Sequence, residues 1–323
     1  MKGLWFNIVF MAVLFSDIVF AQQAVFFSQY PMVGNLHSAT MSGNNINNGP
    51  EAFAGRRLQS IGIPLAGESN FVTFNYTNKP NRSYKVWHNY SFVIFNDKTG
   101  AFKKEKYYAG YNIHFFAKKR TIIALGLLAG VQNIAFERNI IDRGDPIYTR
   151  TAQSYFFIYP DIIPSFRITR KGFFADIAVH RLSINKHKQG KNQIGSAKYQ
   201  PPFLVTTFGK KFKLNDNWVC VSNLMIVLNS SALPFAEMSL LTYYNKRFGA
   251  GISLKNVYSA GAIFQVRALK NLTMGLSYNY ALNKMRTYAP STLEFVIGIS
   301  PYIKEHAKDL IKHDVNRCPS FVH

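Results

Sequence analysis

The feature that most constrains this chain is a two-residue alternation of apolar and polar side chains, which recurs along most of its length. In one segment, Val72, Phe74 and Tyr76 occupy alternate positions, and Thr73 and Asn75 lie between them. Successive side chains of a β-strand point to opposite faces, so such a segment has one apolar and one polar surface. This pattern is typical of a membrane β-barrel, whose strands face lipid outside and a polar lumen inside.

Segments with this alternation, each roughly 9 to 12 residues long, follow one another from about residue 57 to residue 300. They predict an all-β fold: a transmembrane antiparallel β-barrel of about fourteen strands, with twelve as the alternative count. The predicted strands lie near 57–65, 69–77, 86–96, 105–117, 121–134, 161–169, 172–180, 202–213, 216–228, 236–245, 247–255, 257–268, 271–282 and 292–300.

The connections between these segments divide into two kinds that would alternate around the barrel. Long irregular stretches cover 135–160, 181–201, 229–235 and 283–291. Short and mostly basic turns occur at Lys118-Lys119-Arg120, Arg170-Lys171, Leu214-Asn215, Asn245-Lys246 and Lys270-Asn271. Bacterial barrels keep their periplasmic turns short and their extracellular loops long, so the pattern predicts an orientation. A soluble β-sandwich also alternates, but it has no reason to sort its connections this way.

The first 21 residues have the layout of a secretory signal peptide. Lys2 precedes an apolar stretch from Leu4 to Phe20, and the small residue Ala21 marks the expected cleavage site. A membrane anchor is the competing interpretation, but the stretch is short for a span. No later apolar run reaches the roughly 18 residues that a transmembrane helix needs. The sequence therefore predicts an exported chain with residues 57–300 as the barrel.

Composition supports this compartment. Aromatic residues make up 15% of the chain and charged residues 17%, and the latter value is below the globular average of about 25%. The formal net charge of +22 would suggest nucleic acid as a partner in a cytosolic protein. In the outer membrane of a Gram-negative cell, such a charge instead meets lipid A phosphates, acidic glycans and acidic proteins. We therefore expect lipid and lipopolysaccharide contacts and no nucleic acid.

Two regions lie outside the predicted barrel. Residues 22–56 are rich in Asn, Ser and Gly, and they are expected to form a plug or a periplasmic segment. Residues 301–323 form a basic tail on the periplasmic side, in which 302–315 has the apolar spacing of a short helix.

No motif predicts a metal, cofactor or catalytic centre. His180, His187, His306 and His313 lack paired ligands at metal spacing, apart from the loose pair in the tail. Asp176 and His180 are expected to form a structural pair in the lumen, and a hydrolase that uses His180 is the disfavoured alternative. Lys103-Lys104-Glu105-Lys106 and Lys186-His187-Lys188 are expected to be solvated loop faces, with contact to lipid A phosphates as the alternative.

Several short motifs occur in the order found in one bacterial family. They are Phe27-Ser28-Gln29-Tyr30, Arg57-Leu58-Gln59-Ser60-Ile61-Gly62-Ile63, Asn96-Asp97-Lys98-Thr99-Gly100, Gly172 through Leu182, Phe208 through Leu214, Gly275 through Tyr280, Ser291 through Phe295, and Cys318-Pro319-Ser320-Phe321. In this order they resemble the PorP/SprF family of outer-membrane barrels, which serve type IX secretion and gliding in Bacteroidetes. The chain departs from that pattern at 39–43 and at Ser60, where the family has Trp.

The resemblance implies a non-enzymatic role in the export or surface anchoring of proteins with C-terminal sorting domains. It implies two kinds of partner, namely such a secreted substrate and the periplasmic ring lipoprotein and partner subunits. Candidate partner-binding residues are Phe27, Ser28, Gln29, Tyr30, Lys118, Lys119, Arg120, Arg317, Cys318, Pro319 and Phe321. The four residues from Phe27 to Tyr30 also suit a segment that fills the lumen. A passive porin or solute channel remains the rival function.

The two cysteines, Cys220 and Cys318, permit at most one disulfide bond. Cys318 is a free thiol, an anchor for the tail, or the disulfide partner of Cys220. The predicted orientation places Cys220 near the periplasmic rim, where the compartment is oxidising. Pairing requires the tail to fold back against the barrel wall.

Overall fold

The computed structural model describes most of the predicted barrel and one segment that precedes it. The described residues are 26–43, 49–63, 65–78, 86–118, 121–137, 155–182, 202–229, 232–245, 247–256, 259–269, 271–282, 286 and 291–300. The predicted signal peptide, the tail 301–323 and most of the long connections lie outside these residues. None of the described residues forms a helix that is long and apolar enough to cross a membrane.

The described residues form fourteen β-strands and two short 3-10 helices, η1 (Gly34–Leu36) and η2 (Ala39–Met41). The strands are β1 (Gly49–Gln59), β2 (Glu68–Asn78), β3 (Val86–Thr99), β4 (Phe102–Lys118), β5 (Thr121–Phe136), β6 (Tyr155–Arg170), β7 (Phe173–His180), β8 (Phe203–Lys213), β9 (Trp218–Asn229), β10 (Ala232–Tyr244), β11 (Phe248–Lys255), β12 (Ser259–Arg267), β13 (Leu272–Ala281) and β14 (Ser291–Ile299).

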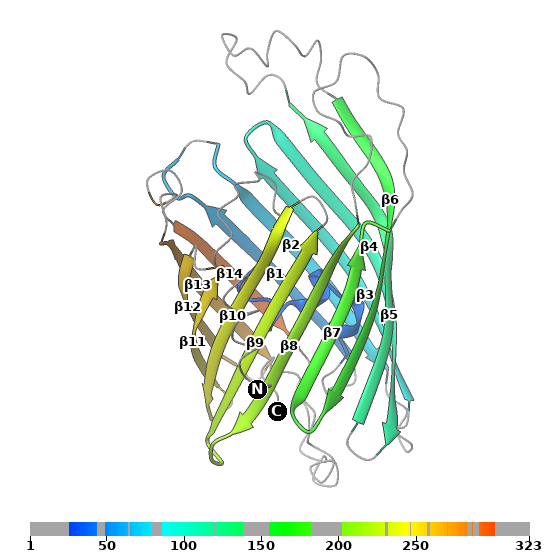
Figure 1. Ribbon diagram of the computed structural model, residues 1–323, viewed down its shortest axis with the longest axis vertical. Coiled ribbons are helices and arrows are strands. Elements are labelled where there is room, and N and C mark those ends of the chain that lie inside the picture. Colours follow the sequence, from blue (N-terminus) through cyan, green and yellow to red (C-terminus); the bar gives the residue numbers. More distant parts are fainter. Residues whose placement is uncertain are drawn as a thin grey trace, which may run out of the picture.

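These strands form one closed antiparallel barrel (Figure 1). Each strand pairs with its neighbours in the sequence, and β1 closes the ring by pairing with β14, with Ala52 opposite Ile299 and Gln59 opposite Thr292. Closure removes every free sheet edge, which a membrane-spanning sheet requires. The predicted fold and the higher of the two predicted strand counts are confirmed.

The side-chain alternation places apolar groups outside and polar groups inside, as predicted. On β2, Val72, Phe74 and Tyr76 are 51%, 46% and 43% exposed, whereas Thr73 and Asn75 are buried. The same alternation on the other strands surrounds the barrel with outward aromatic and aliphatic side chains. An apolar outer surface is stable only in contact with lipid, so the described barrel has the surface of a membrane-spanning protein.

The predicted first strand, 57–65, is wrong, because β1 runs from Gly49 to Gln59. The chain turns immediately afterwards, with Ser60 at φ 54° and Gly62 at φ 90°. Ile61 and Ile63 alternate with Ser60 and Gly62 as the residues of a strand would, but they lie in the turn. The actual strand contains small residues such as Ala52 and Ala54, so its hydrophobic alternation is weak.

The β3–β4 hairpin is also longer than predicted. Its turn lies at Gly100, which has φ 57°, so the segment 96–99 belongs to β3. The basic segment Lys103-Lys104-Glu105-Lys106 lies within β4 rather than on a solvated loop. The expectation was wrong because clustered charges are common in loops but also occur on a barrel strand, where every second side chain faces the polar interior.

The long connections gather at one rim of the barrel. Strand order places 137–154, 181–202 and 282–290 at the rim where β5, β7 and β13 end, which we call the long-connection rim. The predicted long connection 229–235 is wrong, because β9 ends at Asn229 and β10 begins at Ala232. The opposite rim holds 79–85, 119–120, 171–172, 214–217, 245–247 and 268–271, and we call it the short-turn rim.

Candidate functional site

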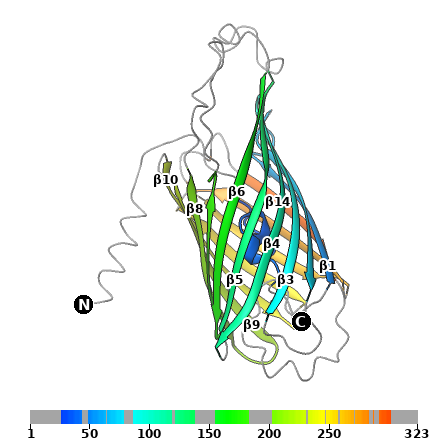
Figure 2. The ribbon, with the colours of Figure 1, turned by 90° about the vertical axis from the view of Figure 1, so that its right-hand side faces the viewer.

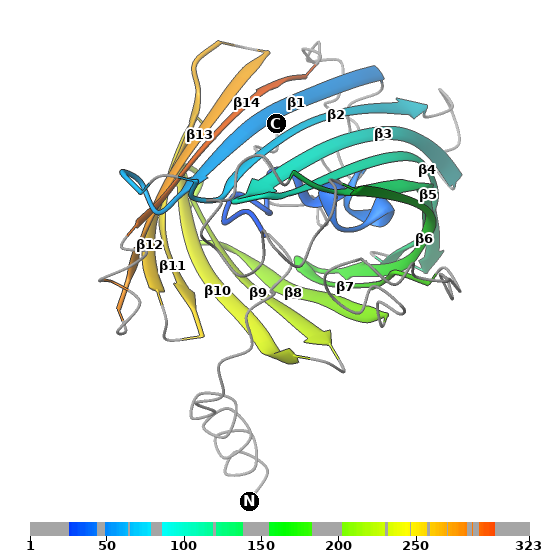
Figure 3. The same ribbon diagram turned by 90° about the horizontal axis from the view of Figure 1, so that it is seen from above.

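Residues 26–43, which we call the lumen segment, lie inside the barrel (Figures 2 and 3). Two single-turn 3-10 helices keep this segment compact, and every residue except the half-buried Met41 is buried. Polar residues such as Ser28, Asn35 and Thr40 are buried here as well. Buried polar groups need hydrogen-bond partners, and the barrel wall supplies many of them.

The Phe27-Ser28-Gln29-Tyr30 motif begins this segment, and all four side chains are at most 1% exposed. The Phe27 ring lies edge-on to Phe71 of β2, with ring centroids 4.9 Å apart. Gln29 accepts a hydrogen bond from Gln265 of β12, with Nε2 and Oε1 2.7 Å apart. The motif therefore contacts distant parts of the wall and leaves almost no side-chain surface for another molecule.

Tyr30 contacts the wall formed by strands β8 to β10. Its ring belongs to a buried cluster with Phe26, Phe203, Val205, Met225 and Val227. Its hydroxyl lies 3.3 Å from Ser239 Oγ. Burial and the neighbouring Glu237 raise the pKa of Tyr30, so the phenol stays protonated at all physiological pH values.

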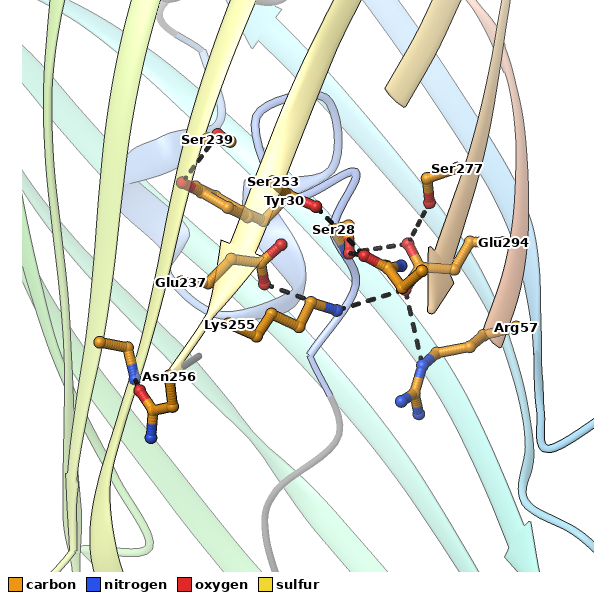
Figure 4. Close-up of polar contacts among 12 residues, drawn as sticks. Ser28, Tyr30, Arg57, Glu237, Ser239, Ser253, Lys255, Asn256, Ser277 and Glu294 are labelled. Atoms are coloured by element: carbon orange, nitrogen blue, oxygen red, sulfur yellow. Dashed lines mark hydrogen bonds and ion pairs between the residues drawn. The ribbon is translucent and has the colours of Figure 1, made fainter. Parts of the chain in front are cut away.

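A buried charge cluster holds the backbone of Ser28 (Figure 4). The Ser28 N–H donates to Glu294 Oε2 at 2.8 Å, and Ser277 Oγ donates to the same oxygen at 2.8 Å. Arg57 Nε lies 3.5 Å from Glu294 Oε1, and Lys255 Nζ lies 4.0 Å from it. Lys255 also lies 3.7 Å from Glu237 Oε2. Two cations thus compensate two buried carboxylates, which would otherwise be costly to bury.

The wall opposite this cluster binds the middle of the lumen segment. Thr40 Oγ1 donates to Asp176 Oδ2 at 2.6 Å, and Arg167 Nη1 lies 3.7 Å from the same oxygen. His180 Nε2 lies 2.8 Å from the backbone oxygen of His37. Four residues along a strand separate two side chains by about 13 Å. The predicted pairing of Asp176 with His180 is therefore wrong, because each side chain bonds to the lumen segment instead.

The end of the lumen segment is held by hydrogen bonds from β3 and β4. Ser42 Oγ donates to Asn89 Oδ1 at 2.7 Å, and Asn112 Nδ2 donates to Ser42 Oγ at 3.0 Å. Trp87 Nε1 donates to the Gly43 oxygen at 2.9 Å, and the indole stacks on His114 with centroids 5.0 Å apart. These contacts hold the last described residues of the lumen segment against β3 and β4.

The other residues expected to bind partners are not all described. Lys118 ends β4 at the short-turn rim, and Cys220 lies near the beginning of β9 at the same rim. Lys119, Arg120, Arg317, Cys318, Pro319 and Phe321 lie outside the described residues, and so does the predicted pairing of Cys220 with Cys318. His187, His306 and His313 lie outside them too. Among the residues placed by the structure, no three His, Cys, Asp or Glu side chains form a metal-ligand cluster.

The sequence provided no role for Glu237, Lys255 or Trp87, although these side chains hold or surround the lumen segment. A signal for the first two was present, because each is a lone charge at an inward position of an alternating strand. Such a charge needs a partner inside the barrel, but the alternation does not show which residue supplies it.

Several solved structures resemble this barrel. The toluene transporter TbuX of Ralstonia pickettii is 10% identical with a TM-score of 0.49, and the match covers 87% of this chain and 98% of that chain. The monoaromatic hydrocarbon channel CymD is 10% identical with a TM-score of 0.50, and the match covers 87% and 95%. The toluene transporter TodX of Pseudomonas putida is 8% identical with a TM-score of 0.48, and the match covers 85% and 94%. At such low identity the likeness concerns the fold alone.

No curated protein sequence is similar enough to this chain to count as a relative. The model of the family described as type IX secretion system membrane protein PorP/SprF matches residues 19–299, which include the lumen segment and all fourteen strands. The chain therefore belongs to the PorP/SprF family of type IX secretion system membrane proteins and is a β-barrel of the outer membrane.

Proposed function

We propose that this protein is a non-enzymatic component of type IX secretion that supports the export or surface anchoring of proteins with C-terminal sorting domains. Family membership supports the secretion role. The observation that carries the proposal is the lumen segment, which is buried and bonded to strands around the barrel. A barrel filled by its own chain suits a docking platform better than a free conduit.

The two rims take different partners in this proposal. The long-connection rim faces outward and holds the sorting domain of the substrate. The short-turn rim and the tail 301–323 face the periplasm and contact the ring lipoprotein and partner subunits, with Lys118, Lys119, Arg120, Arg317, Cys318, Pro319 and Phe321 as candidate contacts. This orientation rests on the general rule that bacterial barrels have short periplasmic turns and long extracellular loops.

Charge pairing supports this division of roles. At the short-turn rim, Arg170, Lys171, Lys210 and Arg247 are exposed, and among the described residues none of them has an acidic partner. At the other rim, the outward-facing Arg56 pairs with Glu68 at 3.0 Å and Lys98 pairs with Glu137 at 3.7 Å. Unpaired cations attract acidic surfaces and steer their association. We therefore expect acidic patches on the periplasmic partners.

The rival function is a passive channel. Phe27, Tyr30 and Thr40 reach different walls from a single buried segment, which argues against a wide water-filled path. A hydrolase is also disfavoured, because the His180 Nε2 contacts the His37 backbone oxygen rather than a nucleophile among the described residues. The proposal accordingly assigns Asp176 and His180 a structural role.

Planar-bilayer conductance tests the filled lumen. We expect the mature protein to give no large steady pore, and we expect Phe27→Ala/Tyr30→Ala to give flickering or steady openings because two anchors of the lumen segment are removed. Phe92→Ala, which changes a lipid-facing side chain, serves as the control and should stay closed. Large steady pores from the unmodified protein would contradict the proposal and favour the porin.

Co-purification tests the partners. A tagged copy, cross-linked in the native membrane, is expected to recover both a secreted surface protein and periplasmic ring subunits. The variant Arg170→Gln/Lys171→Gln/Lys210→Gln/Arg247→Gln should lose the ring subunits and keep the surface protein. The matched control Arg56→Gln/Lys98→Gln changes the opposite rim and should keep the ring subunits. Recovery of neither partner by the unmodified protein would overturn the proposal.

A further inference from the structure

Two lysines of β4 face the lumen above the lumen segment. Alternation along the strand places Lys104 and Lys106 on the same inner face as the buried Tyr108. The register sets Lys106 opposite Phe95 of β3, and the Lys106 Nζ lies 5.1 Å from the centre of that ring. Both lysines are partly buried, and both lie toward the long-connection rim, where β4 begins.

Arg181 extends the same patch from the other side. It directly follows β7, and its guanidinium lies 5.0 Å from the centre of the Phe203 ring. Lys104 and Lys106 both lie within electrostatic range of Arg181. Burial lowers the pKa of Arg181, while Asp161 and Tyr159 oppose that change, but a guanidinium remains charged at neutral pH. Three basic side chains therefore share one part of the lumen wall.

The neighbouring carboxylates do not neutralise these cations by direct contact. Asp97 Oδ1 accepts a hydrogen bond from Ser69 Oγ at 2.6 Å, and Asp161 Oδ2 accepts one from Tyr108 at 2.7 Å. Asp161 also accepts a hydrogen bond from Gln132. Neutral donors thus bind one oxygen of each carboxylate, and no basic side chain within the described residues lies within ion-pair distance of the other.

Within the described part of the chain, Lys104, Lys106 and Arg181 form no ion pair. Their N–H groups are therefore available, and their mutual repulsion makes an added negative charge favourable. The lumen segment lies beside them, since the charge of Lys106 acts on His37 and His180 contacts the His37 backbone. The three side chains come from β4 and from the end of β7, and the rings beside them come from β3 and β8.

We propose that Lys104, Lys106 and Arg181 form a binding site for an oxyanion of the phosphate class on the outward side of the lumen segment. A phosphate group has several acceptor oxygens, and Lys and Arg bind it by short charge-assisted hydrogen bonds. Asp97 and Asp161 lie close enough to lower the net positive charge of the cluster, which suits a single phosphate group rather than a polyanion. This site is independent of the proposed secretion role, so its absence would leave that role intact.

Calorimetric titration of the mature protein in detergent with inorganic phosphate, at constant ionic strength, tests the site. We expect saturable binding by the unmodified protein. Lys106→Gln and Arg181→Gln should each weaken binding about tenfold, since each removes one charge-assisted contact, and Lys104→Gln/Lys106→Gln/Arg181→Gln should abolish it. Lys103→Gln is the matched control, because Lys103 lies on the same strand but pairs with Glu105 at 2.7 Å. This control should bind phosphate normally.

Lys106→Arg keeps the charge and should keep the affinity within about threefold, which separates a lost contact from a damaged fold. Heat-modifiable electrophoretic mobility checks that each variant forms a closed barrel. Competition by purified lipopolysaccharide would identify a lipid headgroup as the source of the phosphate, and its absence would indicate a free phosphate compound. Binding that equals that of a chloride titration, or that persists in the triple variant, would overturn the proposal.

Discussion

The two ends of the lumen segment are held by different physical means. At the first end, Phe27 and Tyr30 bury aromatic rings in apolar clusters, and hydrogen bonds such as those of the Ser28 N–H to Glu294 and of Gln265 to Gln29 add to this burial. At the second end, Ser42 and Gly43 are held by directional hydrogen bonds from Asn89, Asn112 and Trp87. Burial of aromatic area stabilises strongly but tolerates rotation, whereas hydrogen bonds contribute less energy and determine position. Burial at the first end therefore supplies most of the free energy that holds the segment in the lumen, and the hydrogen bonds at the second end determine its position.

Removal of the main aromatic anchor should have the largest effect. Phe27→Ala is expected to destabilise the docked first end by about 3–5 kcal/mol, as for other buried Phe truncations. Hydrogen exchange of the amides of residues 28–42, followed by mass spectrometry, measures this loss. Phe27→Leu should recover more than half of the protection. Unchanged exchange in Phe27→Ala would show that the first end does not depend on aromatic packing.

Asp176→Asn should weaken the middle of the segment by about 2–3 kcal/mol, the range for a hydrogen bond to a charged group. The change removes the charge that faces Arg167 and accepts from Thr40. We expect faster exchange at residues 38–42 and little change at residues 28–30. Asp216→Asn, in an exposed turn, is the control. Equal increases in hydrogen exchange at both ends would contradict the comparison, because the whole segment would then be released from the wall as a single unit.

Acidification should also loosen the segment. Burial and the charge of Lys106 lower the pKa of His37 from 6.5 to about 3, so the docked imidazole stays neutral. The released segment binds a proton below about pH 6.5, and release therefore becomes easier as the pH falls and is unaffected above pH 7. Between pH 6.5 and pH 5 the change amounts to about 1.6 kcal/mol.

Fluorescence of Trp87 in a Trp218→Phe background reports this release, because the Trp87 indole donates to the Gly43 oxygen. We expect His37→Gln to remove most of the pH dependence. His88→Gln, which changes a histidine on β3 hydrogen-bonded to Tyr111 rather than to the lumen segment, should retain it. A pH response of equal size in the His37→Gln variant would assign the effect to another group.

The smallest effect is expected at the second end. Trp87→Phe keeps an aromatic ring beside His114 but loses the hydrogen bond to Gly43, at a cost of about 1 kcal/mol. Exchange near residues 42–43 should rise a few fold, and the first end should not change. Trp218→Phe, which changes an exposed side chain that packs on Tyr244, should have no effect on the segment. Loss of protection at Phe27 would contradict the independence of the two ends.

Much of the fold was predictable from the sequence, because a strand with two different faces carries its signal locally. The alternation of Val72, Phe74 and Tyr76 with Thr73 and Asn75 identified the lipid and lumen faces correctly. The alternation did not identify β1 correctly, because small residues weaken its contrast between apolar and polar positions. At Lys104 and Lys106, the cluster of charges predicted a loop where the structure has a strand. In both places, contacts inside the barrel determine which residues face the lumen, and the local sequence does not show these contacts.

The candidate site was less predictable, since its contacts join residues far apart in the chain. Ser28 and Glu294 are separated by 266 residues, and Thr40 and Asp176 by 136. The short motif at Phe27–Tyr30 indicated a buried or binding role, but it did not indicate which strands would receive each side chain.

The sequence by itself determined the barrel class and the two faces of most strands, because each property depends on neighbours a few residues apart, and it left the strand count between fourteen and twelve. Only the tertiary structure decided that β1 closes on β14, that the lumen segment fills the barrel, and that Arg57 and Lys255 compensate Glu294. Closure brings together side chains from opposite ends of the chain, and burial then selects which of them must pair.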